Sequence, residues 1–390
     1  MSKKTNTPDY ASDVAVKQPK KKKKGSGAFG RFVRRFFLMF FTIIILIVVA
    51  LCLVMNTIFH GPSDAARGLL TMSLMEPSGT KWIPPLFLDE ETLNDIRFGE
   101  NMEMKEEVTK TDLIVINKDA MLSGDNDEFA EHPDGLYIEE YKGATFNAYI
   151  MIIRDPSLVY MGTSTEKYST SIPGKRLNEV MAEADESIIA AINAGAFYDN
   201  GTSDSVVGSV PAGLVYSQGQ MVWNSYHGYI PEDAGGGFVG FNDDNILVVA
   251  KEISPEKAEE LNIRDGCQFG PALIINGEVN MDAYNNASGF NPRTAIGQRE
   301  DGAVIFVCID GRQAGSVGGT YADVVDIMTE YGAVNACNLD GGSSSVMMYR
   351  DMQGLYGTAG EVTMINNYSV MQSQPRRMPN YWLIKTASEE

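Results

Sequence analysis

Two aspartates that follow apolar runs near the C-terminus carry the residue type that acid–base chemistry needs. Asp310 follows the run 303–309 and Asp340 follows the run 334–339, and a glycine comes directly after each of them. Glycine removes a side chain beside the carboxylate, so the backbone can approach a ligand closely. Paired carboxylates cleave glycosides, one as nucleophile or base and the other as acid. Tight turns in which Asp caps its own backbone are the simpler interpretation, but two such pairs together favour a site.

Cationic side chains accompany the aspartates. Arg312 lies two residues after Asp310, and Arg293 comes just before a predicted strand in the sequence NPRTAIG. A guanidinium binds a phosphoryl or carboxylate oxyanion through two parallel hydrogen bonds, so these arginines indicate an anionic leaving group. An ordinary surface ion pair in so acidic a chain is the alternative interpretation of Arg293. Asn193, at the end of another apolar run, adds a weaker sign of a polar loop edge.

A strand, a helix and a second strand position the two aspartates. The run 303–309 predicts a strand, residues 320–331 predict an amphipathic helix that Gly332 ends, and the run 334–339 predicts a second strand. A βαβ unit over 303–340 makes its strands parallel. Both aspartates therefore leave the sheet at the same carboxyl edge, where ligands bind in open sheets.

The rest of the globular part predicts an α+β fold, a mixed twisted β-sheet with few helices. Apolar runs bounded by Gly, Pro and Asp predict strands, and helix-capping residues predict two further helices. The predicted strands are 145–154, 187–193, 212–216, 238–241 and 246–250, and the predicted helices are 176–184 and 254–261.

Residues that the sequence lacks restrict the chemistry. The chain has only three His, at His60, His132 and His227. This small number excludes a His-based metal centre and a phosphohistidine mechanism. It contains neither a G-x-S-x-G elbow nor a phosphate-binding G-x-x-x-x-G-K-[ST] loop. Catalysis must therefore rest on carboxylates with Arg and amide support, and we expect no cofactor. A Ca²⁺ ion bound by Asp310, Asp340 and backbone carbonyls is the alternative.

The length and charge of the chain bound its organisation. Its 390 residues allow two or three domains, and 44% hydrophobic residues are enough to bury a core. The net charge is −19, yet residues 1–35 hold eight Lys and three Arg against two Asp, so the remainder is still more acidic. A body of this charge repels phosphate backbones, which excludes nucleic acid as a partner.

Residues 36–59 form an apolar run without a charge, as long as a transmembrane helix. Lys20–Lys24 and three Arg precede it, so the positive-inside rule predicts a basic cytoplasmic tail at 1–35 and an extracellular remainder. A stalk of short helices and an acidic linker follow at 60–134, and the globular domain covers 135–390. A cleaved signal peptide is the alternative, although the run is longer than the apolar region of such a peptide.

The four Cys exclude a disulfide scaffold. Cys52 lies in the apolar run, which leaves the odd number formed by Cys267, Cys308 and Cys337. Cys308 and Cys337 occur in strand-like apolar runs, so we expect these residues to be small buried hydrophobic side chains rather than a structural disulfide.

Six sequence blocks, in their order and spacing, resemble the phosphodiester glycosidase family. This family includes N-acetylglucosamine-1-phosphodiester alpha-N-acetylglucosaminidase domains and exopolysaccharide-associated bacterial proteins. The most specific blocks are NLDGGSSS and the upstream DGR, whereas this chain has NAGAF where the family often has NGGFF-like glycines. The blocks are Asn193–Asp199, Gly270–Val279, Asn291–Gly297, Cys308–Arg312, Asn338–Ser345 and Pro375–Trp382.

The resemblance implies hydrolysis of a sugar-1-phosphodiester at the anomeric C–O bond, which releases the sugar and a phosphomonoester. It implies that Asp310 or Asp340 is the nucleophile or base and that Arg293 and Arg312 bind the phosphate. The implied substrate-binding residues, on sugar hydroxyls or phosphate oxygens, are Asn193, Asn338, Gly341, Gly342, Ser343, Ser344 and Ser345.

Together these features predict a membrane-anchored extracytoplasmic glycosidase. Its expected partners are the lipid bilayer, through residues 36–59, and a sugar-phosphate or anionic glycan of the cell envelope or of an exopolysaccharide. A non-catalytic module that binds anionic envelope glycans through the same residues is the alternative function.

Overall fold

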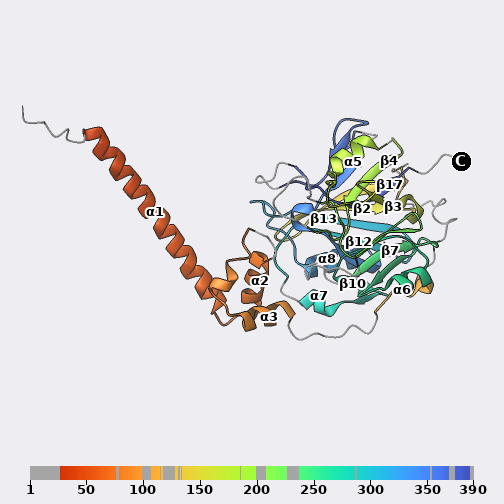
Figure 1. Ribbon diagram of the computed structural model, residues 1–390, viewed down its shortest axis with the longest axis horizontal. Helices are drawn as coiled ribbons and strands as arrows, with labels where there is room; N and C mark the ends of the chain where they lie inside the picture. Colours follow the sequence, from red (N-terminus) through yellow and green to blue (C-terminus); the bar gives the residue numbers. More distant parts are fainter. Residues whose placement is uncertain are drawn as a thin grey trace, which may run out of the picture. The chain divides into compact units, whose positions relative to one another are not determined.

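The computed structural model separates the chain into two compact units, Met1–Thr57 and Ile58–Glu390, and each is described by itself (Figure 1). Most of the predicted basic tail, most of the acidic linker and His227 lie outside the described residues. The described residues are 27–75, 79–98, 107–114, 116, 128–130, 132, 134–184, 186–198, 208–225, 237–285, 288–351, 354–368 and 374–386.

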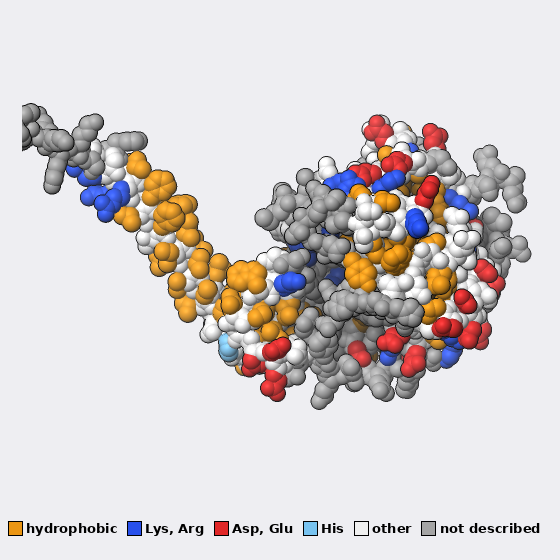
Figure 2. Space-filling view, in the orientation of Figure 1, with side chains coloured by type: hydrophobic (Ala, Val, Ile, Leu, Met, Phe, Trp, Pro, Cys, Tyr) orange, Lys and Arg blue, Asp and Glu red, His pale blue; other side chains and the backbone are white. Residues whose placement is uncertain are grey.

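The first unit contains most of one apolar helix, α1 (Ala28–Phe59). Its 32 residues extend roughly 48 Å at 1.5 Å per residue, which exceeds the thickness of a bilayer hydrocarbon core. Within the described part of the chain it is the one helix long and apolar enough to cross a membrane, with a window of mean hydropathy 3.3 in Gly30–Phe59. Figure 2 shows hydrophobic side chains along this helix and Lys or Arg side chains at its start. The helix contains the predicted span 36–59.

Short helices begin the second unit and pack into a helical module of residues 58–75 and 79–98. Phe59 is 1% exposed, and its ring stacks on that of Phe87 at 5.0 Å. Arg67 Nε donates to the Phe59 carbonyl at 2.8 Å, which satisfies an acceptor at the end of α1. The helices of the module are α2 (Asp64–Met75), the 3-10 turn η1 (Pro84–Leu86) and α3 (Glu90–Phe98).

Three β-sheets follow, and every ladder among the described strands is antiparallel. Across the first sheet the strands are β1 (Leu136–Lys142), β2 (Asn147–Ile153), β13 (Val304–Ile309), β12 (Arg293–Arg299), β14 (Ala333–Leu339), β10 (Ala272–Ile275) and β11 (Glu278–Val279). The second sheet has β16 (Val362–Met364), β15 (Met347–Arg350), β4 (Ile188–Asn193), β17 (Asn380–Lys385) and β3 (Val159–Thr163). The third has β6 (Gln220–Asn224), β5 (Leu214–Ser217), β9 (Ile263–Gln268), β7 (Phe238–Asn242) and β8 (Leu247–Ala250).

Strands β13 and β14 run parallel to each other in the first sheet, with β12 antiparallel between them. Ile309 of β13 pairs with Arg293 at the start of β12, and the last residue of β14 pairs with Thr294. Asp310 and Asp340 therefore follow strand ends at the same edge of the sheet. This confirms the α+β fold with its βαβ unit, and it adds a strand from earlier in the chain between the two parallel strands.

The crossover helix α8 (Tyr321–Glu330) begins and ends as the sequence predicts. The Thr320 hydroxyl accepts from the Asp323 N–H, and the Asp323 carboxylate accepts from the Thr320 N–H, which forms a capping box. Gly332 follows in the left-handed conformation with φ +81°. The apolar face of α8 is buried with residues of the first sheet. The other helices of this unit are α5 (Leu177–Glu183), α6 (Pro255–Glu260) and α7 (Met281–Asn285), with 3-10 turns η2 (Thr111–Leu113), η3 (Pro156–Leu158) and η5 (Gly342–Ser344).

All three sheets contribute to one buried core. The rings of Phe241 from the third sheet and Trp382 from the second meet edge to face at 5.7 Å. Cys267, Cys308 and Cys337 lie in this core as fully buried free thiols, as the sequence predicted. Apolar packing between the sheets therefore holds the edge at which the two aspartates lie.

Candidate active site

A hollow opens at the edge where β13 and β14 end. It is an open hollow rather than a closed cavity, and the roughly 290 Å³ of space at it includes bulk solvent at the mouth. The loops after β13 and β14 line it together with the residue before β12 and the residues after β16. The lining residues are Pro292, Ile309, Asp310, Gly311, Arg312, Gly342, Ser343, Ser345, Asn366, Asn367 and Tyr368.

Asp310 lines the hollow although only 1% of the residue is exposed. Its two carboxylate oxygens accept hydrogen bonds from the backbone N–H and from the side-chain amide of Asn367, each at 2.9 Å. Burial raises the pKa of Asp310, and hydrogen bonds from Asn367 and Asn366 oppose the rise. A carboxylate with a raised pKa is a stronger base than an exposed one, so Asp310 suits a base or nucleophile.

The segment 366–368 also builds the site, although no motif in the sequence pointed to it. The Tyr368 hydroxyl donates to the Ser343 carbonyl at 2.8 Å, which joins this segment to the loop after β14. Burial raises the pKa of Tyr368 above its ordinary range, and the nearby Asp340 carboxylate adds to the rise. Two adjacent Asn residues just after a short apolar run are the signal by which sequence reading could have found this segment.

Arg312 brings a guanidinium to the same hollow. Its backbone is left-handed, with φ +58°, a conformation that costs free energy for a residue with a side chain. Its Nη2 donates to the Asn291 side-chain carbonyl at 3.0 Å. A Cβ at Gly342 would lie 3.1 Å from the same nitrogen, so the absence of a side chain there leaves room for the guanidinium. A strained backbone and a glycine thus present an exposed cation beside Asp310.

Asp340 and Asn193 are joined through the Asp340 backbone. The Asn193 amide N–H donates to the Asp340 carbonyl, and the Asp340 N–H donates to the Ala194 carbonyl at 3.0 Å. Asn193 Oδ1 accepts from the Thr294 hydroxyl at 3.0 Å and from the Val346 N–H at 3.1 Å. Asn193 is fully buried, and it ties β4 of the second sheet to β12 and to the loop after β14.

A comparison with protein families assigns this architecture. The model of a family described as phosphodiester glycosidase matches residues 186–385, just over half of the chain. The chain belongs to the phosphodiester glycosidase family. This match contains both aspartate loops, β12 and the segment 366–368, and it confirms the resemblance that the sequence blocks indicated.

Similar proteins and structures of the glycosidase domain share limited identity with it. The chain is 29% identical over 220 residues to the SPbeta prophage-derived uncharacterized protein YomE of Bacillus subtilis (strain 168). The matched region covers 55% of this chain and 29% of that protein. The zebrafish N-acetylglucosamine-1-phosphodiester alpha-N-acetylglucosaminidase catalytic domain, auto-inhibited by its pro-peptide, is 20% identical, with a TM-score of 0.49 over 65% of this chain and 82% of that chain. A putative exported protein from Burkholderia pseudomallei K96243 is 15% identical, with a TM-score of 0.42 over 62% of this chain and 74% of that chain.

Within the glycosidase domain, Arg293 is buried beside the hollow, with 4% of the residue exposed. Its Nη2 donates to the Gly289 carbonyl at 2.7 Å, and its Nε donates to the Gly319 carbonyl at 3.2 Å. The guanidinium also lies 4.3 Å from the centroid of the Tyr321 ring. Arg293 therefore fastens the segment before β12 to the start of α8.

The serines and amides of the glycosidase loops divide between the hollow and the surrounding backbone. Ser343 and Ser345 line the hollow, and the buried Ser345 hydroxyl has no hydrogen-bond partner among the described residues. The Asn338 amide instead donates to the Gly270 carbonyl at 2.9 Å. Of the residues that the sequence singled out, the hollow gathers Asp310, Arg312, Gly342, Ser343 and Ser345, and its lining does not include Asp340, Arg293, Asn193, Asn338, Gly341 or Ser344.

Proposed function

We propose that the protein hydrolyses a sugar-1-phosphodiester at the anomeric C–O bond and releases the sugar and a phosphomonoester. The observation that carries this proposal is that a buried aspartate and an exposed guanidinium, Asp310 and Arg312, line one hollow. Membership of the phosphodiester glycosidase family supports the same reaction class. The carboxylate acts at the anomeric carbon that is attacked, and the guanidinium stabilises the phosphate that leaves.

In this proposal Asp310 acts as nucleophile or base at the anomeric carbon. Its hydrogen bonds from Asn367 orient the carboxylate, and burial makes it more basic. As a base, Asp310 takes a proton from a water molecule that attacks the carbon; as a nucleophile, it attacks the carbon itself, and water then hydrolyses the glycosyl ester to release the sugar. In either case the C–O bond to phosphate breaks and its electron pair stays on the phosphate oxygen. The departing phosphomonoester is a stabilised anion, so a strong general acid matters less than in ordinary glycoside cleavage.

Arg312 and Ser345 bind the phosphate in this proposal. A guanidinium offers several N–H donors in one plane, and the Ser345 hydroxyl is a buried donor without a partner among the described residues. Asp340 and Arg293 act indirectly in this proposal, without contacting the reacting atoms. Asp340 places negative charge beside Tyr368, and Arg293 holds the backbone that precedes β12.

Assay of the full-length protein in detergent on an N-acetylhexosamine-1-phosphodiester tests the proposed function. We expect reducing sugar and phosphomonoester in equal amounts, and in ¹⁸O-labelled water we expect the label in the sugar, because the bond at carbon breaks. Label in the phosphate would show attack at phosphorus and contradict the proposal. Binding of the diester without any product would favour the non-catalytic module for anionic glycans.

We expect this hydrolysis to be unchanged by metal removal. The proposed chemistry needs a carboxylate and a guanidinium but no Lewis acid, and no group of three or more His, Cys, Asp or Glu among the described residues is arranged to hold a metal ion. Initial rates before and after dialysis against EDTA measure the effect. A loss of rate that Ca²⁺ alone restores would support the Ca²⁺ alternative, with Asp310, Asp340 and backbone carbonyls as hard oxygen ligands.

We also propose that α1 anchors the protein in a membrane, with the basic N-terminus in the cytoplasm and the glycosidase domain outside. The apolar length of α1 and the arginines at its start support this orientation. It would give the site access to sugar phosphates of the cell envelope or of an exopolysaccharide. We expect protease added to intact cells to digest the domain and to leave an N-terminal tag in the membrane fraction. A mature protein that lacks residues 1–59 would identify a cleaved signal peptide instead.

A further inference from the structure

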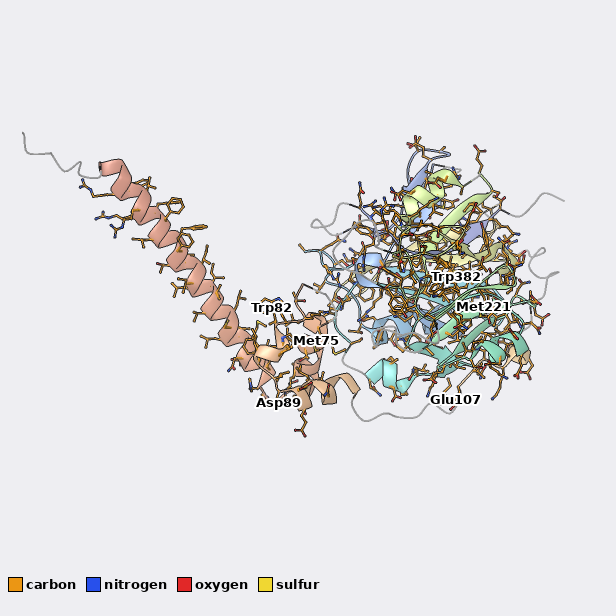
Figure 3. The ribbon with its side chains drawn as sticks, viewed as in Figure 1. Met75, Trp82, Asp89, Glu107, Met221 and Trp382 are labelled. Carbon is orange, nitrogen blue, oxygen red and sulfur yellow. The ribbon has the colours of Figure 1, made fainter. Side chains whose placement is uncertain are left out.

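The helical module touches the glycosidase domain directly beside the candidate site. The Phe290 N–H donates to the hydroxyl of Ser73, in the last turn of α2, at 2.9 Å. A Cβ at Gly289 would lie 2.2 Å from the backbone nitrogen of Ser73, so the two backbones are in contact without a side chain between them. Figure 3 labels Met75, the last residue of α2, on the side of the module that faces the glycosidase domain. The module itself lies outside the family match, which begins at residue 186.

A short series of hydrogen bonds joins this contact to Arg312. Gly289 is also the residue whose carbonyl accepts from the buried Arg293 guanidinium at 2.7 Å. Two residues later, Asn291 exchanges backbone hydrogen bonds with Gly319 at 3.0 and 3.2 Å. The Asn291 side-chain carbonyl accepts from Arg312 Nη2 at 3.0 Å. The segment that α2 fixes is therefore the segment that holds the cation of the hollow.

We propose that α2 is a positioning element of the active site: its contact at Gly289 and Phe290 places Asn291, and Asn291 directs the Arg312 guanidinium at the substrate phosphate. The inference rests on the proposed function in assigning the phosphate to Arg312. It adds α2, which lies outside the family match, to the site. The positioning residues are Ser73 and Gly289, since neither lines the hollow.

Loosening the contact between α2 and the segment 289–291 should weaken substrate binding. Arg312 already has an unfavourable left-handed backbone, and the exposed side chain has many rotamers available. The hydrogen bond to Asn291 selects among those rotamers. If the segment 289–291 shifts by a fraction of an ångström, that selection weakens and the phosphate meets a less ordered cation.

Gly289→Ala in the full-length protein is the test, with Gly79→Ala as its matched control. Gly79 belongs to the same module, but nothing lies within 4 Å of the position of its Cβ. We expect Gly289→Ala to raise the KM for the diester about tenfold with little change in kcat, since a charge-assisted contact of this kind is worth a factor of that order. Gly79→Ala should match the wild type. Ser73→Ala, which adds no atoms, should give a smaller change in the same direction.

A double-mutant cycle with Arg312→Ala separates positioning from a general loss of structure. If α2 acts through Arg312, Gly289→Ala should have almost no further effect on KM in the Arg312→Ala background. Equal effects in both backgrounds would overturn the inference, as would a fall in kcat that follows the loss of folded protein in a thermal melt.

Binding of a sugar-1-phosphate, measured by calorimetry, distinguishes failure of this inference from failure of the proposed function. A wild type that binds the sugar-1-phosphate but turns over no diester refutes the function alone. The same variants then test the inference through affinity, with the weakening by Gly289→Ala again expected to disappear in the Arg312→Ala background. A wild type that neither turns over the diester nor binds the sugar-1-phosphate overturns both.

Discussion

Replacement of Asp310 by Asn should lower kcat for diester hydrolysis by about 10²- to 10⁴-fold, the range that a general base or nucleophile contributes. The amide has the shape of the carboxylate, and its oxygen can still accept one of the two hydrogen bonds from Asn367, so we expect the hollow to keep its form. What the variant loses is the negative charge at the anomeric carbon. Release of phosphomonoester under substrate saturation measures kcat, and circular dichroism checks that the variant is folded.

Asp265→Asn is the matched control for this prediction. Asp265 is likewise 1% exposed, and burial raises the pKa of Asp265, although hydrogen bonds from Gln218 and Met161 and an ion pair with Arg264 oppose the rise. It does not line the hollow. We therefore expect folded Asp265→Asn to keep the wild-type kcat. If Asp340→Asn abolishes turnover while Asp310→Asn does not, the chemical role belongs to Asp340.

The pH dependence of activity should also identify Asp310 as the reacting carboxylate. Only ionised Asp310 can attack or accept a proton, so activity should fall as the pH drops through its raised pKa, above the ordinary value of 3.8. Stability runs the other way: the folded state holds this proton more tightly, so the contribution of Asp310 to stability is fully present below the ordinary pKa and is lost as the pH rises through the raised one. The acid limb of the rate profile should disappear in Asp310→Asn.

Replacement of Asn193 by Ala should destabilise the protein by about 3–5 kcal/mol, because it leaves three polar groups, two of them buried and one partly buried, without their partner at once. These groups are the Asp340 carbonyl, the Thr294 hydroxyl and the Val346 N–H. The midpoint of unfolding in denaturant measures the change. Asn285→Ala is the control, since Asn285 is an exposed helix residue, and it should change the midpoint little.

A substrate-binding role for Asn193, as the sequence resemblance implies, makes the opposite forecast. In that case Asn193→Ala would raise KM while the unfolding midpoint stayed close to that of the wild type. The full burial of Asn193 and the use of both its amide atoms within the protein favour the stability effect.

The βαβ unit was predictable because all its signals are local. The capping residue Thr320, the apolar spacing of the helix and Gly332 lie within one short stretch, and the parallel direction of β13 and β14 follows from chain connectivity. The strand between them was not predictable. β12 precedes the βαβ unit in the chain, and the sequence of a strand does not determine which strands it pairs with.

The candidate site shows the same limit at the level of side chains. Asp310 and Arg312 lie where the spacing placed them, because each follows directly from the end of β13. Arg293 has the same residue type and a similar place at the sheet edge, yet its guanidinium donates to backbone carbonyls. Composition cannot separate these two uses of arginine, since burial decides between them and burial depends on distant segments.

The place of β17 in the second sheet has a consequence for when the protein becomes active during its synthesis. β17 is the last strand of the described chain, yet it lies between β3 and β4, and Tyr381 pairs with Asn193. The strand that carries Asn193 therefore gains this second neighbour only after residues 380–385 have been synthesised. A nascent chain that stops before β17 should hydrolyse no substrate, and activity should appear only in chains that include β17.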